Sequence, residues 1–197
     1  MKKAIKILLG IIGFGLFIIL ITIFLSNVVI KSNISKNEIK VSESWHELFN
    51  VTTERYSFLR KNIPQKNDIY RQIINNEIKR AEFADYNSES YIQMEYLLNE
   101  NLVNYFDTIS NLTQEIEDFG LKNICYNNEL NKLIDKYNNS VKAHNIYISR
   151  FPNFIIAKRN NFNKKKYFAI KYGIRNDDPE MVRKEKPKWA ENVDDNI

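Results

Sequence analysis

The feature that most constrains this chain is an uninterrupted apolar run near its amino terminus. Residues 7–30 carry no charge and consist largely of Ile, Leu, Phe and Val. A helix over this run is roughly 36 Å long, enough to cross a hydrocarbon core of about 30 Å. A cleaved signal peptide has a shorter apolar region followed by a small-x-small site, and residues 25–30 contain no such site. The sequence therefore predicts an uncleaved, single transmembrane anchor at 7–30, behind a short basic head at 1–6.

Glycine and proline are scarce beyond this run. Only Gly120 and Gly173 follow the apolar run, and the whole chain has four prolines. Hairpin-rich β folds and phosphate-binding loops need glycine where φ is positive. The composition therefore favours an all-α fold and disfavours nucleotide-binding folds.

Apolar residues after the anchor recur at three- and four-residue steps, which predicts long amphipathic helices. We expect these at about 41–63, 69–84, 88–119 and 130–151, with Gly120 ending the third. In the third, apolar residues recur every seven residues at Leu98, Tyr105, Leu112 and Phe119. No glycine or proline separates the anchor from the first of them, so one helix can run through both. The predicted architecture is a transmembrane helix followed by an antiparallel bundle of about four long helices. The bundle with a C-terminal capping segment covers 34–172, and a mobile charged tail covers 173–197.

The last predicted helix has two apolar rows with a seven-residue repeat. One row is Leu130, Tyr137, His144 and Phe151, and the other is Ile134, Val141 and Ile148. Asn138 and Asn145 also lie seven residues apart, and an asparagine at a repeat position fixes the register between helices. We therefore expect the rows to be buried and the asparagines to align two helices.

Residues near both ends of the predicted domain form a shared pattern. A Tyr-Asn pair is followed by Val, a second Asn, Ile and a Phe-Pro pair, and then by Ala, Phe and a Tyr-Phe pair. Upstream, a Trp precedes an Arg-Tyr pair by ten residues. This pattern resembles the LemA family, although Ser57–Arg60 replaces the family's usual Asp-Leu-Ile-Pro and the glycine-bearing linker after Phe-Pro is missing. The matching residues, whose expected role is structural, are Trp45, Arg55, Tyr56, Tyr137, Asn138, Val141, Asn145, Ile148, Phe151, Pro152, Ala157, Phe162, Tyr167 and Phe168.

This resemblance implies a divergent member with one membrane helix and a bundle of long antiparallel helices. It carries over no established biochemical activity.

No residue pattern indicates catalysis or metal binding. His46 and His144 are far apart, and Cys125 is the single cysteine. A zinc site needs several His or Cys at short spacings, and a di-metal bundle needs Glu-x-x-His, which the sequence lacks. We expect no catalytic residue, no cofactor and no metal ligand, with an enzyme assembled from scattered residues as a minor alternative.

Charge is distributed in blocks. Residues 32–149 carry a net charge of −4 and residues 150–188 a net charge of +8. Basic side chains among aromatic ones can contact an anionic bilayer, at about 1 kcal/mol for each Lys or Arg, or can remain solvated while the aromatic rings pack inward. Nucleic acid is not an expected partner. The residues expected at an anionic surface are Lys158, Arg159, Lys164, Lys165, Lys166 and Lys171.

Two functions remain open. The first is a non-enzymatic, membrane-anchored scaffold or adaptor of the bacterial cell envelope, which binds another envelope protein or itself. The second is a domain that binds anionic lipid through the basic aromatic segment at 158–172. Basic residues nearly balance across the span, and we adopt the orientation with a cytoplasmic amino terminus and the domain outside.

Overall fold

The structure, a computed structural model, describes residues 2–63, 68–83, 89–109 and 113–185. Throughout these ranges the regular structure is helical, which confirms the all-α prediction for them. The helices are α1 (Lys2–Asn62), α2 (Asp68–Phe83), α3 (Glu89–Thr108), α4 (Gln114–Ser149), α5 (Asn153–Arg159) and α6 (Pro179–Glu185).

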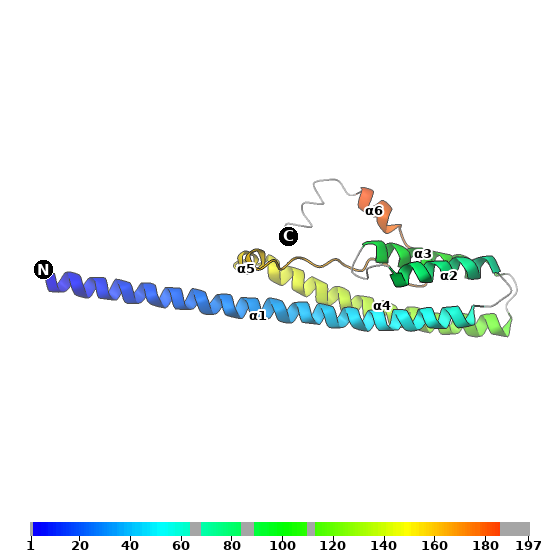
Figure 1. The fold of residues 1–197 in the computed structure, drawn as a ribbon, viewed down its shortest axis with the longest axis horizontal. Coiled ribbons are helices and arrows are strands. Elements are labelled where there is room, and N and C mark those ends of the chain that lie inside the picture. Colours follow the sequence, from blue (N-terminus) through cyan, green and yellow to red (C-terminus); the bar gives the residue numbers. More distant parts are fainter. Residues whose placement is uncertain (1, 64–67, 84–88, 110–112, 186–197) are drawn as a thin grey trace.

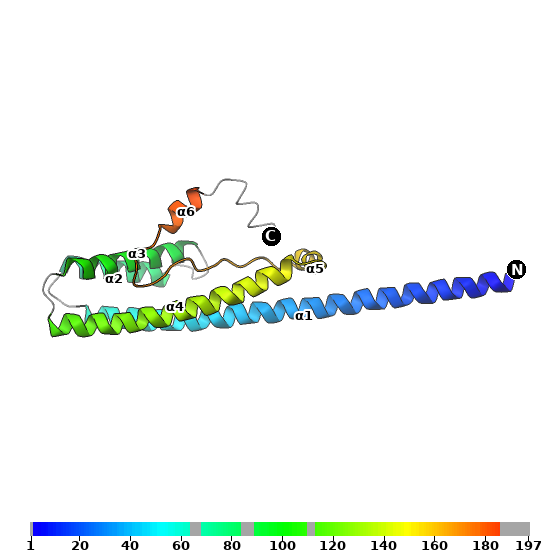
Figure 2. The same ribbon diagram turned by 180° about the vertical axis from the view of Figure 1, so that it is seen from behind.

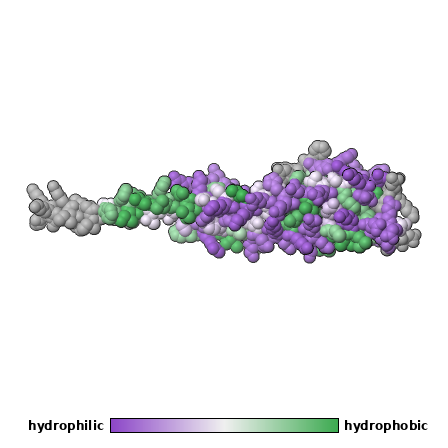
Figure 3. Space-filling view, turned by 90° about the horizontal axis from the view of Figure 1, so that it is seen from below, coloured by the Kyte–Doolittle hydropathy of each residue, from purple (hydrophilic) through white to green (hydrophobic). Residues whose placement is uncertain are grey.

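Helix α1 joins the apolar run to the folded domain without a break. It is 61 residues long, which corresponds to roughly 90 Å. Its first part projects away from the other helices (Figure 1). Figure 3 shows hydrophobic surface on this projecting part and a mostly hydrophilic surface over the domain. Among the described residues, α1 is the one helix long and apolar enough to cross a membrane. One helix therefore runs through both the apolar run and the first predicted amphipathic segment, as expected.

Helix α4 runs back along the second half of α1. Phe58 stacks on Phe119 with ring centroids 5.5 Å apart, and Trp45 meets Tyr137 edge-on at 5.3 Å. Residue numbers therefore rise along α1 as they fall along α4, and both ribbon views show the two helices side by side (Figures 1 and 2).

Helices α2 and α3 pair with each other and cover the end of the α1–α4 pair that is distant from the projecting part (Figure 1). Side chains of all four helices form one core cluster, since each helix presents an apolar stripe to the others. Its buried members are Tyr56, Leu59, Ile63, Ile74, Ile78, Ala81, Leu98, Leu102, Tyr105 and Phe119.

The break between α3 and α4 falls earlier than predicted. Helix α3 ends at Thr108 and α4 begins at Gln114, so Gly120 lies inside α4 rather than at a helix end. Thr113 has extended dihedral angles (φ −100°, ψ 160°) at the N-cap position. Two glutamates occupy the first turn of α4, where carboxylates interact favourably with the helix dipole.

The seven-residue repeat concealed this break because residues on both sides of it face the same core. Tyr105 of α3 and Phe119 of α4 are both buried, and their rings meet edge-on at 6.1 Å. Leu112, a member of the predicted repeat, lies outside the described residues. A helical repeat therefore identified the buried residues correctly and the connectivity wrongly.

The buried rows of α4 are confirmed, with one exception. Leu130, Ile134, Tyr137, Val141, His144 and Ile148 are buried, whereas Phe151 is 79% exposed. The prediction for Phe151 is wrong because the helix ends at Ser149 and the next residue is extended (ψ 146°), as expected close to a proline.

The first part of the predicted tail is held against α3. Asn99 accepts a hydrogen bond from the Gly173 N–H (2.8 Å) and donates one to the Ile174 carbonyl (2.7 Å). Glu100 accepts another from the Asn176 N–H at 3.0 Å. Residues 186–197 of that predicted tail lie outside the described residues.

Candidate functional site

An extended segment, residues 163–172, follows α5 and runs back along α4. Three asparagines of α4 hold its backbone. Each side-chain amide accepts a hydrogen bond from the N–H of one residue and donates one to the carbonyl of the same residue. The pairs are Asn145 with Lys165 (2.8 and 2.9 Å), Asn138 with Phe168 (2.8 and 2.9 Å), and Asn131 with Tyr172 (2.9 and 3.1 Å).

The spacing of these pairs matches helix geometry to extended-chain geometry. The asparagines are seven residues apart, which is a rise of about 10.5 Å along a helix. Their partners are three and four residues apart, which is roughly 10–13 Å of extended chain. We expected Asn138 and Asn145 to align two helices; instead they set the register of the extended segment, and Asn131 extends the series.

Two further α4 side chains bind this segment. His144 Nε2 donates to the Asn163 carbonyl at 3.1 Å, and the Tyr137 hydroxyl donates to the Lys166 carbonyl at 3.0 Å. Burial lowers the pKa of His144 and raises the pKa of Tyr137 to about 12. Both side chains are therefore neutral donors near pH 7.

The residues of the LemA-like pattern separate into two groups in space. Trp45 packs against Tyr137 (5.3 Å) and Phe168 (6.0 Å) in one aromatic cluster. Arg55 and Tyr56 lie about 15 Å further along α1 and are also buried. Among the rest, Val141, Ile148 and Ala157 are buried, Asn138, Asn145 and Phe162 are half-buried, and Phe151, Pro152 and Tyr167 are exposed.

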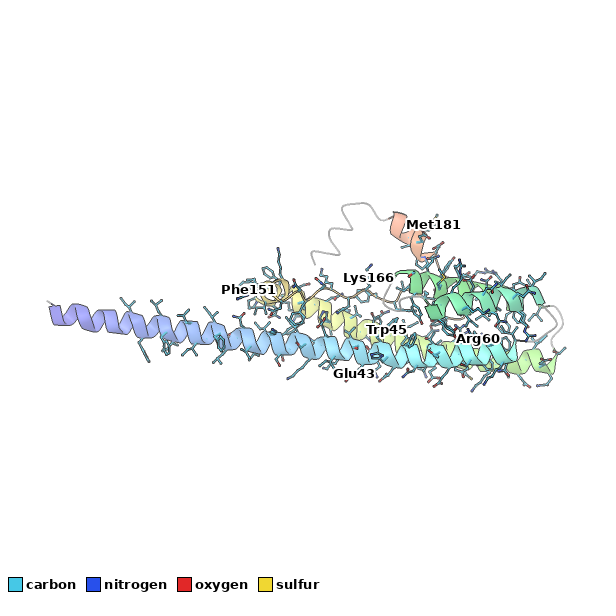
Figure 4. The ribbon with its side chains drawn as sticks, viewed as in Figure 1. Glu43, Trp45, Arg60, Phe151, Lys166 and Met181 are labelled. Atoms are coloured by element: carbon cyan, nitrogen blue, oxygen red, sulfur yellow. The ribbon has the colours of Figure 1, made fainter. Side chains whose placement is uncertain are left out.

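The basic residues lie on two elements, α5 and the extended segment, and differ in exposure. Lys165 pairs with Glu38 at 2.7 Å, which ties the extended segment to α1. Lys158 and Arg159 are exposed on α5, and Lys171 is exposed near the end of the extended segment. Lys164 is half-buried, and Lys166 is exposed on the extended segment, at its label in Figure 4.

A buried polar cluster lies between α1, α3 and the end of the extended segment. Glu95 of α3 accepts hydrogen bonds from two hydroxyls, one from Tyr56 and one from Tyr172 at 2.6 Å. The guanidinium carbon of Arg55 lies 4.7 Å from the centroid of the Tyr172 ring. Arg55 and Glu95 are both 0% exposed, so a cation and a carboxylate share the interior.

Protonation of this cluster reflects its burial. Burial raises the pKa of Glu95 to about 7, although the charge of Arg55 and the hydrogen bond from Tyr172 act in the opposite direction. Burial also lowers the pKa of Arg55 and raises the pKa of Tyr172 well above its usual value. Glu95 therefore titrates near neutral pH, while Arg55 keeps its charge.

A cavity of about 300 Å³ opens beside this cluster, between α3, α4 and the turn at Gly173. None of the three guanidinium nitrogens of Arg55 has a hydrogen-bond partner among the described residues, and neither does Oδ1 of Asn123 or of Asn127. Each unpaired buried polar group costs about 1–3 kcal/mol. The remaining walls are Asn99, Leu102, Val103, Phe106, Asp107, Gly120, Ile124 and Gly173.

Arg55 and Tyr56 belong to the family pattern, whereas Glu95, Asn99, Asn123 and Asn127 belong to no pattern found in the sequence. One signal was available: Glu95 occupies a position among apolar residues of α3. A charged residue there predicts a buried partner, but the partner lies on another helix.

Within the described ranges, no group of three or more His, Cys, Asp or Glu residues is arranged to hold a metal ion. Comparison of the chain with family models, with curated proteins and with solved structures found no match.

Proposed function

We propose that this protein is a membrane-anchored, non-enzymatic helical scaffold or adaptor of the bacterial cell envelope, similar in kind to the LemA family. Residues 7–30 span the cell membrane once, with the amino terminus in the cytoplasm and the domain outside. Helices α1 to α4 act as one antiparallel four-helix bundle. The partner is another envelope protein or a second copy of the chain.

The continuity of α1 carries this proposal. Sharp bends in helices arise almost always at proline, at Gly/Ser pairs, at π-bulges or where a group inserts into the hydrogen-bond ladder. No glycine or proline occurs between Gly15 and Pro64, and α1 is buried in the domain from Ile34 onward. The domain is therefore a rigid extension of the anchor. A rigid extension presents its faces at a fixed height above a bilayer, as a scaffold requires.

Position-specific crosslinking tests the proposal in native membranes. Cys125 is the single cysteine and is exposed on α4, so a maleimide photo-crosslinker labels the unaltered chain at one site. A scaffold gives a discrete adduct or a crosslinked dimer. In Ser32→Pro, a proline placed after the anchor bends the helix and weakens that adduct, while Ser32→Ala preserves it. If neither Cys125 nor a cysteine introduced at another exposed site, Leu121, gives a discrete product, the scaffold proposal is wrong.

A second candidate function is contact with anionic lipid, which the surface of α5 favours. Phe151, Phe154 and Ile155 are 79%, 47% and 50% exposed, next to Lys158 and Arg159. Figure 4 shows Phe151 at the end of the domain nearest the projecting part of α1. The buried side of α5 packs in a cluster with Ile30 and Ile34, where the apolar run ends. This surface differs from the segment expected at 158–172, in which Phe168 and Tyr172 are buried.

Hydrogen exchange of the α5 amides tests this second candidate. The full chain is compared in nanodiscs of anionic and of zwitterionic lipid. Lipid contact predicts slower exchange of α5 in anionic nanodiscs and loss of that difference in Phe151→Ser/Phe154→Ser. Equal exchange in both lipids contradicts lipid contact and leaves the scaffold proposal unaffected.

A further inference from the structure

The cavity beside Arg55 contains donors and acceptors that the described residues leave unsatisfied. Arg55 is 0% exposed, and its guanidinium has five N–H donors. Its nearest carboxylate in the cluster, Glu95, already accepts from Tyr56 and Tyr172 through its two oxygens. Arg55 therefore contributes a positive charge and a planar set of donors to the cavity wall. A guanidinium in this state matches a carboxylate, which binds it through two parallel hydrogen bonds.

Two asparagines of α4 in the same lining have a different requirement. Oδ1 of Asn123 and Oδ1 of Asn127 are buried without a donor among the described residues. These two oxygens need an N–H or O–H group. A simple inorganic anion has no apolar part and few donors, so it satisfies Arg55 and leaves both amides unpaired.

The remaining walls define the body of the ligand. Leu102, Val103, Phe106 and Ile124 are apolar, so the ligand carries a short aliphatic or similar group. A volume of about 300 Å³ equals that of about ten water molecules, which limits the ligand to roughly ten to fifteen non-hydrogen atoms.

The mouth of the cavity does not repel an anion. Asp107 lies at the rim and is exposed, but Arg175 donates to it at 2.7 Å. Ile124, also on the lining, is 53% exposed. Solvent therefore reaches the cavity between α3 and α4, past a carboxylate whose charge is already paired.

We propose that this cavity binds a small carboxylate that also carries an N–H or O–H donor and a short apolar group, the chemistry of an N-acylated amino acid or a hydroxy acid. The carboxylate pairs with Arg55, the donor binds Asn123 or Asn127, and the apolar group contacts Leu102 and Phe106. This site is independent of the scaffold function, and it gives the domain a ligand-dependent state.

Calorimetric titration of the full chain in nanodiscs tests the proposal. The probes are N-acetyl-leucine and 3-hydroxyhexanoate, and the neutral control is N-acetyl-leucinamide. We expect saturable binding of at least one acid at concentrations up to about 10 mM. Loss of the charge-assisted pair makes the neutral amide bind at least about tenfold more weakly than N-acetyl-leucine.

Two variants locate the binding. Arg55→Gln retains hydrogen-bond donors without the charge and loses acid binding. Because Arg55 is in the core, Val103→Trp is the second variant: Val103 is half-buried on the lining, and an indole there fills the cavity. Ile146→Trp is the matched control, since Ile146 is 42% exposed on α4 and does not line the cavity.

The expected result is loss of binding in Val103→Trp and retention in Ile146→Trp, both with unchanged circular dichroism. Absence of binding by both acids overturns the proposal, because the cavity then holds only water. Equal binding of N-acetyl-leucine and N-acetyl-leucinamide, or retained acid binding in Val103→Trp, overturns it as well.

Discussion

Replacing Asn138 with alanine is the most direct test of how the C-terminal segment is held. The Asn138 side chain makes two hydrogen bonds to Phe168, one to its N–H (2.8 Å) and one to its carbonyl (2.9 Å). Each such bond contributes a net 0.5–1.5 kcal/mol, roughly 1–3 kcal/mol for the pair. Alanine also has the higher helix propensity, by roughly 0.6 kcal/mol in a helix interior.

Asn139→Ala is the matched control, because Asn139 is the next residue of the same helix and is exposed. The propensity gain is equal in the two variants and cancels in their difference. Asn138→Ala should therefore be less stable than Asn139→Ala by about 2 kcal/mol. Urea unfolding of the full chain in detergent, followed by circular dichroism, measures this difference.

Hydrogen exchange distinguishes this explanation from a general loss of stability. The amides of residues 163–172 should exchange faster in Asn138→Ala, while those in the centre of α1 remain protected. If the two variants are equally stable, or if protection falls uniformly along the chain, the paired hydrogen bonds do not hold the segment.

Two further predictions concern the interior. The first uses Glu95, whose pKa is about 7 in the fold because of burial, against a usual 4.5. The folded state therefore binds a proton more tightly than the unfolded state, so stability falls as the pH rises from about 4.5 to about 7, by on the order of 3 kcal/mol. Glu95→Gln should remove this pH dependence, which urea unfolding of both proteins across that pH range measures. If the unfolding free energy of the variant changes with pH as much as that of the unaltered protein, the prediction is wrong. The second compares two glycines. Gly173 has φ +83°, and an added Cβ meets Asn127 Nδ2 at 2.8 Å, so Gly173→Ala should destabilise the protein by about 1–3 kcal/mol. Gly120 lies inside α4, and an added Cβ comes no closer than 3.4 Å to Phe106, so Gly120→Ala should stabilise the protein by about 0.5–1 kcal/mol. Thermal unfolding measures this contrast: the melting temperature should fall in Gly173→Ala and rise in Gly120→Ala. A change in the same direction in both variants contradicts the prediction.

The cation–carboxylate pair in the core and the asparagine series meet at one residue. The Tyr172 N–H donates to the Asn131 side chain and the Tyr172 carbonyl accepts from it, while the Tyr172 hydroxyl donates to Glu95. Its ring faces Arg55 at 4.7 Å. Tyr172 therefore links the extended segment to the buried charges of α1 and α3.

The sequence alone determined the local features of this protein. Residues 7–30 are apolar and uncharged, and the seven-residue rows from Leu130 to Ile148 are buried as expected. Both follow from side-chain polarity and helical periodicity, which depend on neighbours along the chain. The same periodicity placed a helix end at Gly120, because Tyr105 and Phe119 are buried in the same cluster although they belong to different helices.

Only the tertiary structure decided where the polar side chains go. Asn131, Asn138 and Asn145 resemble any polar face of a helix in sequence, and their role requires an extended segment whose bonded residues lie 20, 30 and 41 positions away. Arg55 resembles a solvated arginine until α3 and Tyr172 enclose it beside Glu95. Hydrogen bonds and charge pairs of this kind form between residues distant in sequence, so their partners are fixed by packing rather than by local pattern.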